Sequence, residues 1–227
     1  MSYLLYYNPN SANLVIRMAL EELGLDYEDR FVERRHYQRD EAFHKLNPRG
    51  LLPVLVDRQT EAVVFETGAA LLYLAERHGR LAPPMDRPVG RADFLKWLFL
   101  LSNTLHADLR LRFYSDRFVT EKADVPSLLH KSRERILNHL GVIEESFASH
   151  GGPWLLASGL SVCDIYLGCC VRWTQMFPAD HRIPPEEIMA FPKMVESLTT
   201  LQDFASIRQS LLKEDLDGPA FIDPEIG

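Results

Sequence analysis

Residues 47–56 read NPRGLLPVLV, a stretch that combines a strand pattern with a residue that strands normally exclude. Leu51 to Val56 form the apolar run typical of a buried β-strand, yet Pro53 stands near its start. Proline cannot donate a hydrogen bond to a sheet, and it restricts the residue before it. Either Pro53 belongs to an edge strand, or the Leu52–Pro53 bond is cis and presents the backbone of Leu52 to an extended peptide ligand.

The segments around this stretch alternate between strand and helix patterns up to about residue 80. Their order is strand, helix, strand, helix, strand, strand, helix, which predicts a small α/β domain over residues 1–80. The segments are YLLYY (3–7), SANLVIRMALEELG (11–24), DYEDRFVE (26–33), RDEAFHKL (39–46), LLPVLVD (51–57), AVVFE (62–66) and TGAALLYLAERHG (67–79).

The second part of the chain contains helix patterns only. RLAPPMDRPVGR at 80–91 is rich in proline, which predicts a linker over residues 81–91. An all-helical domain is expected over residues 92–227, so the fold class is α/β plus all-α. Its first helix places one apolar face toward the core: Phe94, Trp97, Leu98, Leu101 and Leu105. We expect a loop at 177–192 and an extended or disordered tail from residue 217.

Composition excludes several classes of protein. The formal net charge of −7 argues against binding to nucleic acid, which requires a basic surface. The apolar segment FLKWLFLL is too short to span a bilayer, and residues 1–7 do not resemble a signal peptide, so we expect a cytoplasmic protein without membrane contact. Cys163, Cys169 and Cys170 lack the spacing of metal ligands, which favours reduced core cysteines and no metal site.

Glu66 and Thr67 lie where the last predicted strand of the α/β domain meets its last helix. Backbone N–H groups at a helix start, with a threonine hydroxyl beside them, form a site for a carboxylate. Glu66 adds a negative charge suited to an ammonium, so the pair matches the head group of an α-amino acid. The alternative is a plain helix N-cap formed by Thr67.

NPNSAN at 8–13 follows the first strand and opens the first helix. The side chains of Ser11, Asn10 and Asn13 can donate hydrogen bonds to an anion there, and a thiol at a helix N-terminus loses its proton more easily. The alternative is again helix capping. A further motif, SVCD at 161–164, fits a structural capping box before an apolar helix.

The combination of NPRGLLPVLV, VVFETGAALLYLAE (63–76), a proline-rich linker and GLSVCDIYLG (159–168) resembles the cytosolic glutathione transferase family. The resemblance covers residues 3–212 and implies a thioredoxin-like first domain followed by a helical second domain. It implies that the Leu52–Pro53 bond is cis and that the backbone of Leu52 pairs with the cysteinyl part of glutathione. Glu66 and Thr67 would hold the γ-glutamyl end, and Gln38, with Arg39 beside it, would meet the glycyl carboxylate.

The same resemblance leaves the sulfur-binding residue open. No cysteine occurs in the first 162 residues, which excludes the cysteine-using classes. Alignment from the strand favours Ser11 as the residue that stabilises the thiolate, and alignment from the helix favours Asn10 or Ala12, with Asn13 a further alternative. Leu51 also departs from the family, because relatives often carry lysine there.

The activity that the resemblance implies is conjugation of the glutathione thiolate to a small hydrophobic electrophile, as in detoxification. Glutathione would be the co-substrate, and the chain would form a homodimer. A glutathione-dependent peroxidase or disulfide reductase, and a non-catalytic binding or regulatory protein of the same fold, are the alternatives. The second substrate is expected between the domains, next to the following residues: Tyr7, His106, Arg110, Phe113, Tyr114 and Trp173.

Overall fold

The computed structural model describes residues 2–33 and 41–225. The chain divides into two compact units. The first comprises residues 1–81 together with 204–217, and the second comprises residues 82–203 together with 218–227.

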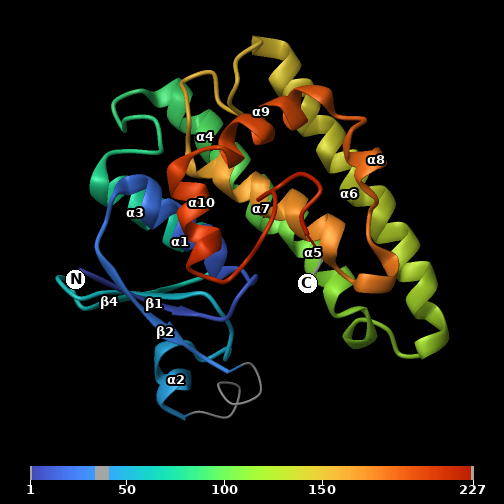
Figure 1. Cartoon of the computed structure of the whole chain (residues 1–227), viewed down its shortest axis with the longest axis horizontal. Coiled ribbons are helices and arrows are strands. Elements are labelled where there is room, and N and C mark those ends of the chain that lie inside the picture. The colour runs from blue at the N-terminus through green and yellow to red at the C-terminus, as the bar shows by residue number, and fades with distance from the viewer. Residues whose placement is uncertain (1, 34–40, 226–227) are drawn as a thin grey trace. The chain divides into compact units, whose positions relative to one another are not determined.

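A four-stranded sheet with the strand order β2-β1-β3-β4 forms the centre of the first unit (Figure 1). Strand β1 pairs in parallel with β2 and antiparallel with β3, and β3 pairs antiparallel with β4. The α/β domain that the segment order predicts and the thioredoxin-like arrangement that the family resemblance implies are both confirmed. The elements are β1 (Tyr3–Tyr7), α1 (Asn13–Leu23), β2 (Tyr27–Phe31), α2 (Glu41–Leu46), β3 (Val54–Asp57), β4 (Ala62–Phe65) and α3 (Thr67–His78).

The helix boundaries in this unit follow from the sequence. Gly24 and Gly79 end α1 and α3 in left-handed backbone conformations, with φ of 68° and 60°, which glycine adopts at little cost. Helix α1 packs against both α3 and β1. Leu5 on β1 and Leu14 on α1 are fully buried, as expected for an apolar helix face on a sheet.

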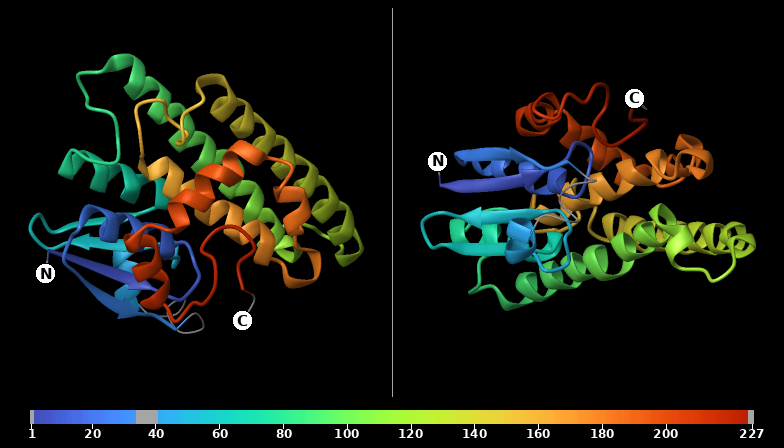
Figure 2. Two further views of the ribbon diagram at one scale, coloured as in Figure 1. Left: turned by 45° about the horizontal axis from the view of Figure 1, so that its top comes forward. Right: turned by 90° about the horizontal axis from the view of Figure 1, so that it is seen from below.

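Helix α10 (Ala205–Leu212) belongs to the first unit, although it lies near the end of the chain. Figures 1 and 2 show it beside α1, and the two helices are in contact. The sequence assigned all of residues 92–227 to the helical domain, because helical periodicity does not reveal which core a helix joins. The structure places residues 204–217 with the sheet instead.

The second unit is helical among the residues that the structure describes. Helix α7 contacts α4, α5 and α9, and every residue of it is buried. A helix that is buried all round is typical of the centre of a bundle. The helices are α4 (Pro88–Leu100), α5 (His106–Phe113), α6 (Val125–His150), α7 (Val162–Met176), α8 (Pro185–Ile188) and α9 (Pro192–Gln202).

Two predictions in this unit are wrong: the end of the linker and the continuity of the first helix. The linker predicted over residues 81–91 is shorter, because α4 begins at Pro88, where proline is tolerated in the first helical turn. The single helix predicted after it is interrupted by a π-helical turn at Leu101–Leu105. The predicted apolar face is nevertheless correct, since Phe94, Leu101 and Leu105 are fully buried.

The capping box predicted at the start of α7 is confirmed. Ser161 accepts a hydrogen bond from the N–H of Cys163, and Oδ2 of Asp164 accepts one from the N–H of Ser161 at 2.8 Å. Oδ1 of Asp164 also accepts from the N–H of Leu155 at 2.7 Å, so the carboxylate joins the preceding loop to the helix. Burial raises the pKa of Asp164 to about 6.

The segments expected to be irregular are largely so. Residues 177–192 contain only the short helix α8 and one 3₁₀ turn. The described part of the tail has no regular structure, but it is held in place because Nη1 of Arg172 donates to the carbonyl oxygen of Ala220 at 3.0 Å. Phe221 is buried against Gly168, where a Cβ would lie 2.8 Å from the aromatic ring.

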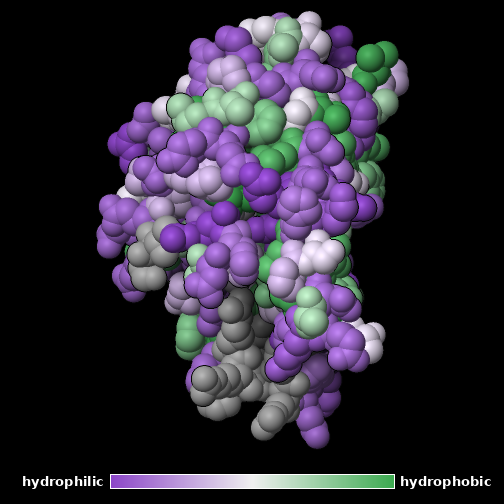
Figure 3. Space-filling model, turned by 90° about the vertical axis from the view of Figure 1, so that its right-hand side faces the viewer, coloured by the Kyte–Doolittle hydropathy of each residue, from purple (hydrophilic) through white to green (hydrophobic). Residues whose placement is uncertain are grey.

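On the face drawn in Figure 3, hydrophilic residues predominate, with hydrophobic residues between them and along one edge. Within residues 2–33 and 41–225, no helix has the length and apolar character needed to cross a membrane.

Candidate functional site

The strand register brings the predicted site segments of the first unit to one edge of the sheet. Val54, the first residue of β3, lies opposite Tyr6 on β1 and Phe65 on β4. The chain before β3, the chain after β1 and the chain after β4 therefore all leave the sheet at this edge. These segments contain Leu52 and Pro53, the loop 8–13, and Glu66 with Thr67.

The loop before β3 is shaped by Asn47, which is almost fully buried. Its Nδ2 donates to the carbonyl oxygen of Leu51 at 2.7 Å, and its Oδ1 accepts from the N–H of Arg49 at 3.0 Å. Gly50 has a φ of 59°, and a Cβ on it would lie 2.7 Å from the ring of His44. The sequence analysis assigned no role to Asn47, although an asparagine before proline is a recognised turn signal.

The Leu52–Pro53 peptide bond is cis, which decides between the two alternatives of the sequence analysis and agrees with the family resemblance. Leu52 precedes the paired residues of β3, so its backbone lies outside the ladder. Its side chain packs against a small core cluster that contains Phe43 and Val54. The side chain is thus used for packing, while the backbone lies at the edge where the ladder stops.

Thr67 does not act as a plain N-cap. It is the first residue of α3, and Glu66 occupies the N-cap position without a side-chain capping bond. Glu66 has a φ of 70°, which is uncommon for a residue other than glycine and occurs preferentially at functional sites. Its Oε1 lies 2.7 Å from Nη1 of Arg49, a partner that the sequence analysis missed. The edge therefore carries a carboxylate, a guanidinium and the N-terminus of a helix.

The loop 8–13 is held by its own side chains. Ala12, not Ser11 or Asn10, occupies the N-cap position of α1 and makes no side-chain bond, so the capping alternative is wrong. The hydroxyl of Ser11 has two acceptors, the carbonyl oxygen of Asn8 at 2.8 Å and Oδ1 of Asn13. Asn10 has a left-handed backbone with a φ of 54°.

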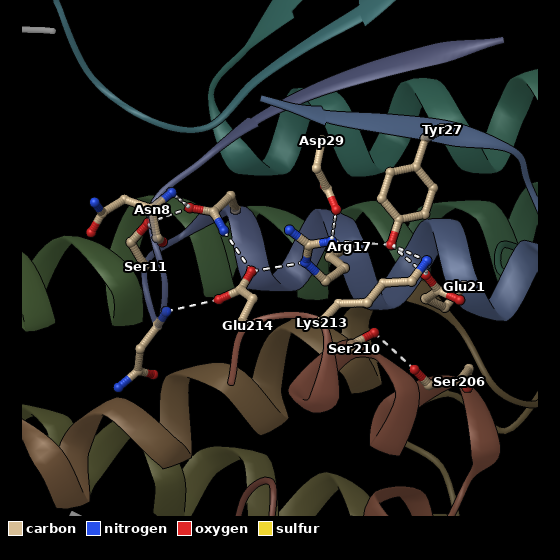
Figure 4. Close-up of polar contacts among 12 residues, drawn as sticks. Asn8, Ser11, Arg17, Glu21, Tyr27, Asp29, Ser206, Ser210, Lys213 and Glu214 are labelled. Atoms are coloured by element: carbon tan, nitrogen blue, oxygen red, sulfur yellow. Dashed lines mark hydrogen bonds and ion pairs between the residues drawn. The ribbon is translucent and has the colours of Figure 1, made fainter. Parts of the chain in front are cut away.

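A carboxylate from the far end of the chain reaches this loop. Oε2 of Glu214 accepts a hydrogen bond from the N–H of Asn10 at 2.8 Å, and Oε1 accepts from Nδ2 of Asn13 at 2.8 Å (Figure 4). Oε1 also accepts from Nε of Arg17 at 2.9 Å. No sequence motif marks Glu214 or Arg17 as part of this site.

Tyr7 lies at the end of β1 with Arg17 beside its ring, at 4.8 Å from the guanidinium carbon to the ring centre. Partial burial, followed by the charge of Asp29, raises the pKa of the Tyr7 phenol. The phenol is therefore neutral near neutral pH.

The remaining residues predicted near the second substrate belong to the second unit. His106, Arg110 and Phe113 lie on α5, and Tyr114 follows it. Nδ1 of His106 lies 2.7 Å from the hydroxyl of Tyr166, and its ring is 5.1 Å from that of Trp173. Burial, and then Arg110, lower the pKa of His106 to about 4. Their role beside a substrate stays a prediction.

Two further expectations concern other groups. Gln38 and Arg39 lie outside the described residues. Cys163, Cys169 and Cys170 are buried free thiols, and burial raises the pKa of Cys163 and Cys170. Within the described part of the chain, no group of three histidine, cysteine or carboxylate side chains is placed to hold a metal ion.

Known proteins resemble this chain in sequence and in fold. Residues 1–76 match the family model described as "Glutathione S-transferase, N-terminal domain". The glutathione S-transferase-like protein OpS6 of Beauveria bassiana is 30% identical over 155 residues, which cover 66% of this chain and 68% of OpS6. The disulfide-bond oxidoreductase YfcG of Escherichia coli is 26% identical over 93% of this chain and 95% of its own.

The fold agrees with these matches. A glutathione transferase homologue from Sulfitobacter, solved with bound glutathione, superposes with a TM-score of 0.78 at 22% identity, covering 94% of this chain and 99% of that one. The sequence matches, together with the thioredoxin-like sheet and its cis-proline, show that this chain belongs to the glutathione S-transferase family.

Proposed function

We propose that the protein is a glutathione transferase that joins the thiolate of glutathione to small hydrophobic electrophiles. The observation that carries this proposal is the convergence of Leu52, Glu66, Thr67 and the loop 8–13 at one edge of the sheet. Each of these segments supplies the chemistry that one part of the tripeptide requires.

The peptide part of the ligand would be held by backbone and charge. The N–H and C=O of Leu52, beyond the end of the ladder, can pair with the cysteinyl residue as an added strand would. The N-terminus of α3, with the hydroxyl of Thr67, can bind the γ-glutamyl carboxylate. The carboxylate of Glu66 can bind the neighbouring ammonium.

The sulfur would lie at the loop 8–13, where Ser11 is the proposed hydrogen-bond donor and Asn10 the alternative. Lowering the pKa of a thiol by about two units requires roughly 2.7 kcal/mol. One charge-assisted hydrogen bond together with a helix N-terminus can supply this amount. The thiolate then attacks the electrophilic carbon of the second substrate: with an aryl halide, the new carbon–sulfur bond replaces the carbon–halogen bond, and halide leaves with the bonding electrons.

A second candidate is reduction of disulfides or hydroperoxides by glutathione. It is supported by the similarity to YfcG, which extends over nearly the whole chain. Because the described cysteines are buried, such a reaction would use glutathione thiols and not those of the protein. A non-catalytic binding role is a third candidate, because a fold does not fix a function.

One set of measurements separates these functions. Retention on immobilised glutathione distinguishes a binder from a non-binder. Among binders, turnover of an aryl halide with glutathione supports conjugation, and turnover confined to a disulfide or a hydroperoxide supports the second candidate. Binding without any turnover would support the third. We also propose a homodimer, and a monomer in sedimentation at micromolar concentration would contradict it.

A further inference from the structure

Residues 204–217 are fixed to the thioredoxin-like unit at several points. Lys213 donates to Oε1 of Glu21 at 2.6 Å and to the hydroxyl of Tyr27 at 3.1 Å (Figure 4). Ser206 donates to Glu22. This anchoring places Glu214 directly under the loop 8–13.

The side chain of Glu214 is fully buried, and both of its oxygens accept hydrogen bonds. Burying a carboxylate is costly unless it is paired and hydrogen-bonded. The charge of Glu214 is balanced by Arg17, whose side chain is also fully buried.

A counter-ion role for Arg17 does not account for the whole arrangement. Arg17 already pairs with Asp29, at 2.6 Å between Nη1 and Oδ2. The other bonds of Glu214 go to the loop, to the N–H of Asn10 and to Nδ2 of Asn13. Glu214 therefore holds the loop 8–13 through two hydrogen bonds, in addition to its ion pair with Arg17.

The carboxylate fixes the orientation of the Asn13 amide. Because an ionised carboxylate only accepts hydrogen bonds, Asn13 must turn its NH₂ group toward Glu214. Its carbonyl oxygen then faces the N–H of Asn8, at 3.1 Å, and the hydroxyl of Ser11. The single proton of that hydroxyl thus points into the loop, toward Asn13 or the carbonyl of Asn8.

We propose that Glu214 is a positioning residue of the sulfur site: it holds the loop 8–13 and, through Asn13, keeps the proton of Ser11 turned into the loop. This inference rests on the proposed function, in which Ser11 donates to the glutathione thiolate. The thiolate obtains that proton only in competition with Oδ1 of Asn13 and the carbonyl oxygen of Asn8, and it also feels the negative charge of Glu214. Both effects raise the pKa of the bound thiol.

The test is Glu214→Gln, which replaces one oxygen with an NH₂ group and removes the charge. If the NH₂ group replaces Oε1, it faces Nδ2 of Asn13 and releases the Asn13 amide. If it replaces Oε2, it faces the N–H of Asn10 and loosens the loop there, while the remaining oxygen still accepts from Asn13. The pKa of bound glutathione, read from thiolate absorbance, should fall by about one unit. In a Ser11→Ala background the same substitution should produce at most half of that shift, because the route through Ser11 is absent.

Asp29→Asn is the matched control, since it removes the other carboxylate from Arg17 without touching the loop. It should lower stability and leave the pKa of the bound thiol in place.

If Glu214→Gln does not fold, Asn13→Ala cuts the same connection and should shift the pKa in the same direction. A bound-thiol pKa that stays unchanged or rises in Glu214→Gln and Asn13→Ala would overturn the role of Glu214 but not the proposed function. A wild-type protein that gives no thiolate signal with glutathione would overturn the proposed function as well.

Discussion

Nη1 of Arg49 lies 2.7 Å from Oε1 of Glu66, so an ion pair joins the loop before β3 to the start of α3. Their side chains are 50% and 56% exposed, and exposed pairs of this kind contribute at most about 1 kcal/mol to folding. The pair therefore has little structural value, and the carboxylate of Glu66 stays accessible at the edge of the sheet.

Glu66→Gln should weaken glutathione binding roughly 10-fold, because the γ-glutamyl ammonium loses a charged acceptor. A glutathione analogue without that amino group should bind both proteins almost equally. Titration calorimetry with the two ligands measures the difference, and Arg49→Gln controls for the loss of the ion pair. Equal weakening for both ligands would show that Glu66 does not contact the ammonium.

Ser11→Ala should raise the pKa of bound glutathione and lower turnover near neutral pH, with a smaller loss of affinity. The reason is that the thiolate loses a hydrogen-bond donor but keeps the helix N-terminus. A thiolate absorbance titration gives the pKa directly. An unchanged value in Ser11→Ala, with a raised value in Asn10→Ala, would transfer the role to Asn10.

Asp164→Ala should lower the free energy of unfolding by about 2 kcal/mol or more, because the buried N–H groups of Leu155 and Ser161 lose their acceptor. The pKa of Asp164 is raised from 3.8 to about 6, so the folded state binds its proton more tightly than the unfolded state. The stability that comes from this tighter proton binding, separate from that of the hydrogen bonds, is complete below about pH 4 and is lost as the pH rises through about 6. Urea unfolding at several pH values tests this; an identical pH dependence in Asp164→Asn would contradict it.

His106 should show the opposite dependence. Its pKa is lowered from 6.5 to about 4, so the unfolded state takes up the proton first as the pH falls. The stability that it contributes is complete above about pH 6.5 and is lost as the pH falls toward about 4. NMR titration of the imidazole should place its pKa near 4, and His106→Gln should lack this component of the unfolding curve. An imidazole that titrates near 6.5 would show that the ring is solvated.

The sequence predicted the parts of this structure that depend on local pattern. The order of elements, the apolar face through Phe94 and Leu101, and the capping box of Ser161 and Asp164 all follow from residues close together in the chain. The cis bond before Pro53 followed only from the family resemblance. The segments that form the candidate site were also predicted from local sequence. The strand register then brings these segments together at one edge of the sheet.

What the sequence did not reveal depends on distant contacts. Glu214 bonds to Asn10 across 204 positions, and nothing in the residues around Glu214 marks it as a partner of that loop. The same holds for α10, whose apolar periodicity is compatible with either unit. The π-helical turn before His106 likewise leaves the helical pattern nearly unchanged, so it could not be read from spacing.

The proposed function requires that Thr67 contact the γ-glutamyl carboxylate at the N-terminus of α3, and the affinity of Thr67→Val for glutathione tests this contact. The substitution keeps the shape of the buried side chain but removes a charge-assisted hydrogen bond, which contributes about 1.5–3 kcal/mol. The dissociation constant should therefore rise roughly 10- to 150-fold. Thr174→Val, which also removes a buried hydroxyl, should leave it unchanged. A lower melting temperature with unchanged affinity in Thr67→Val would contradict this account of the site.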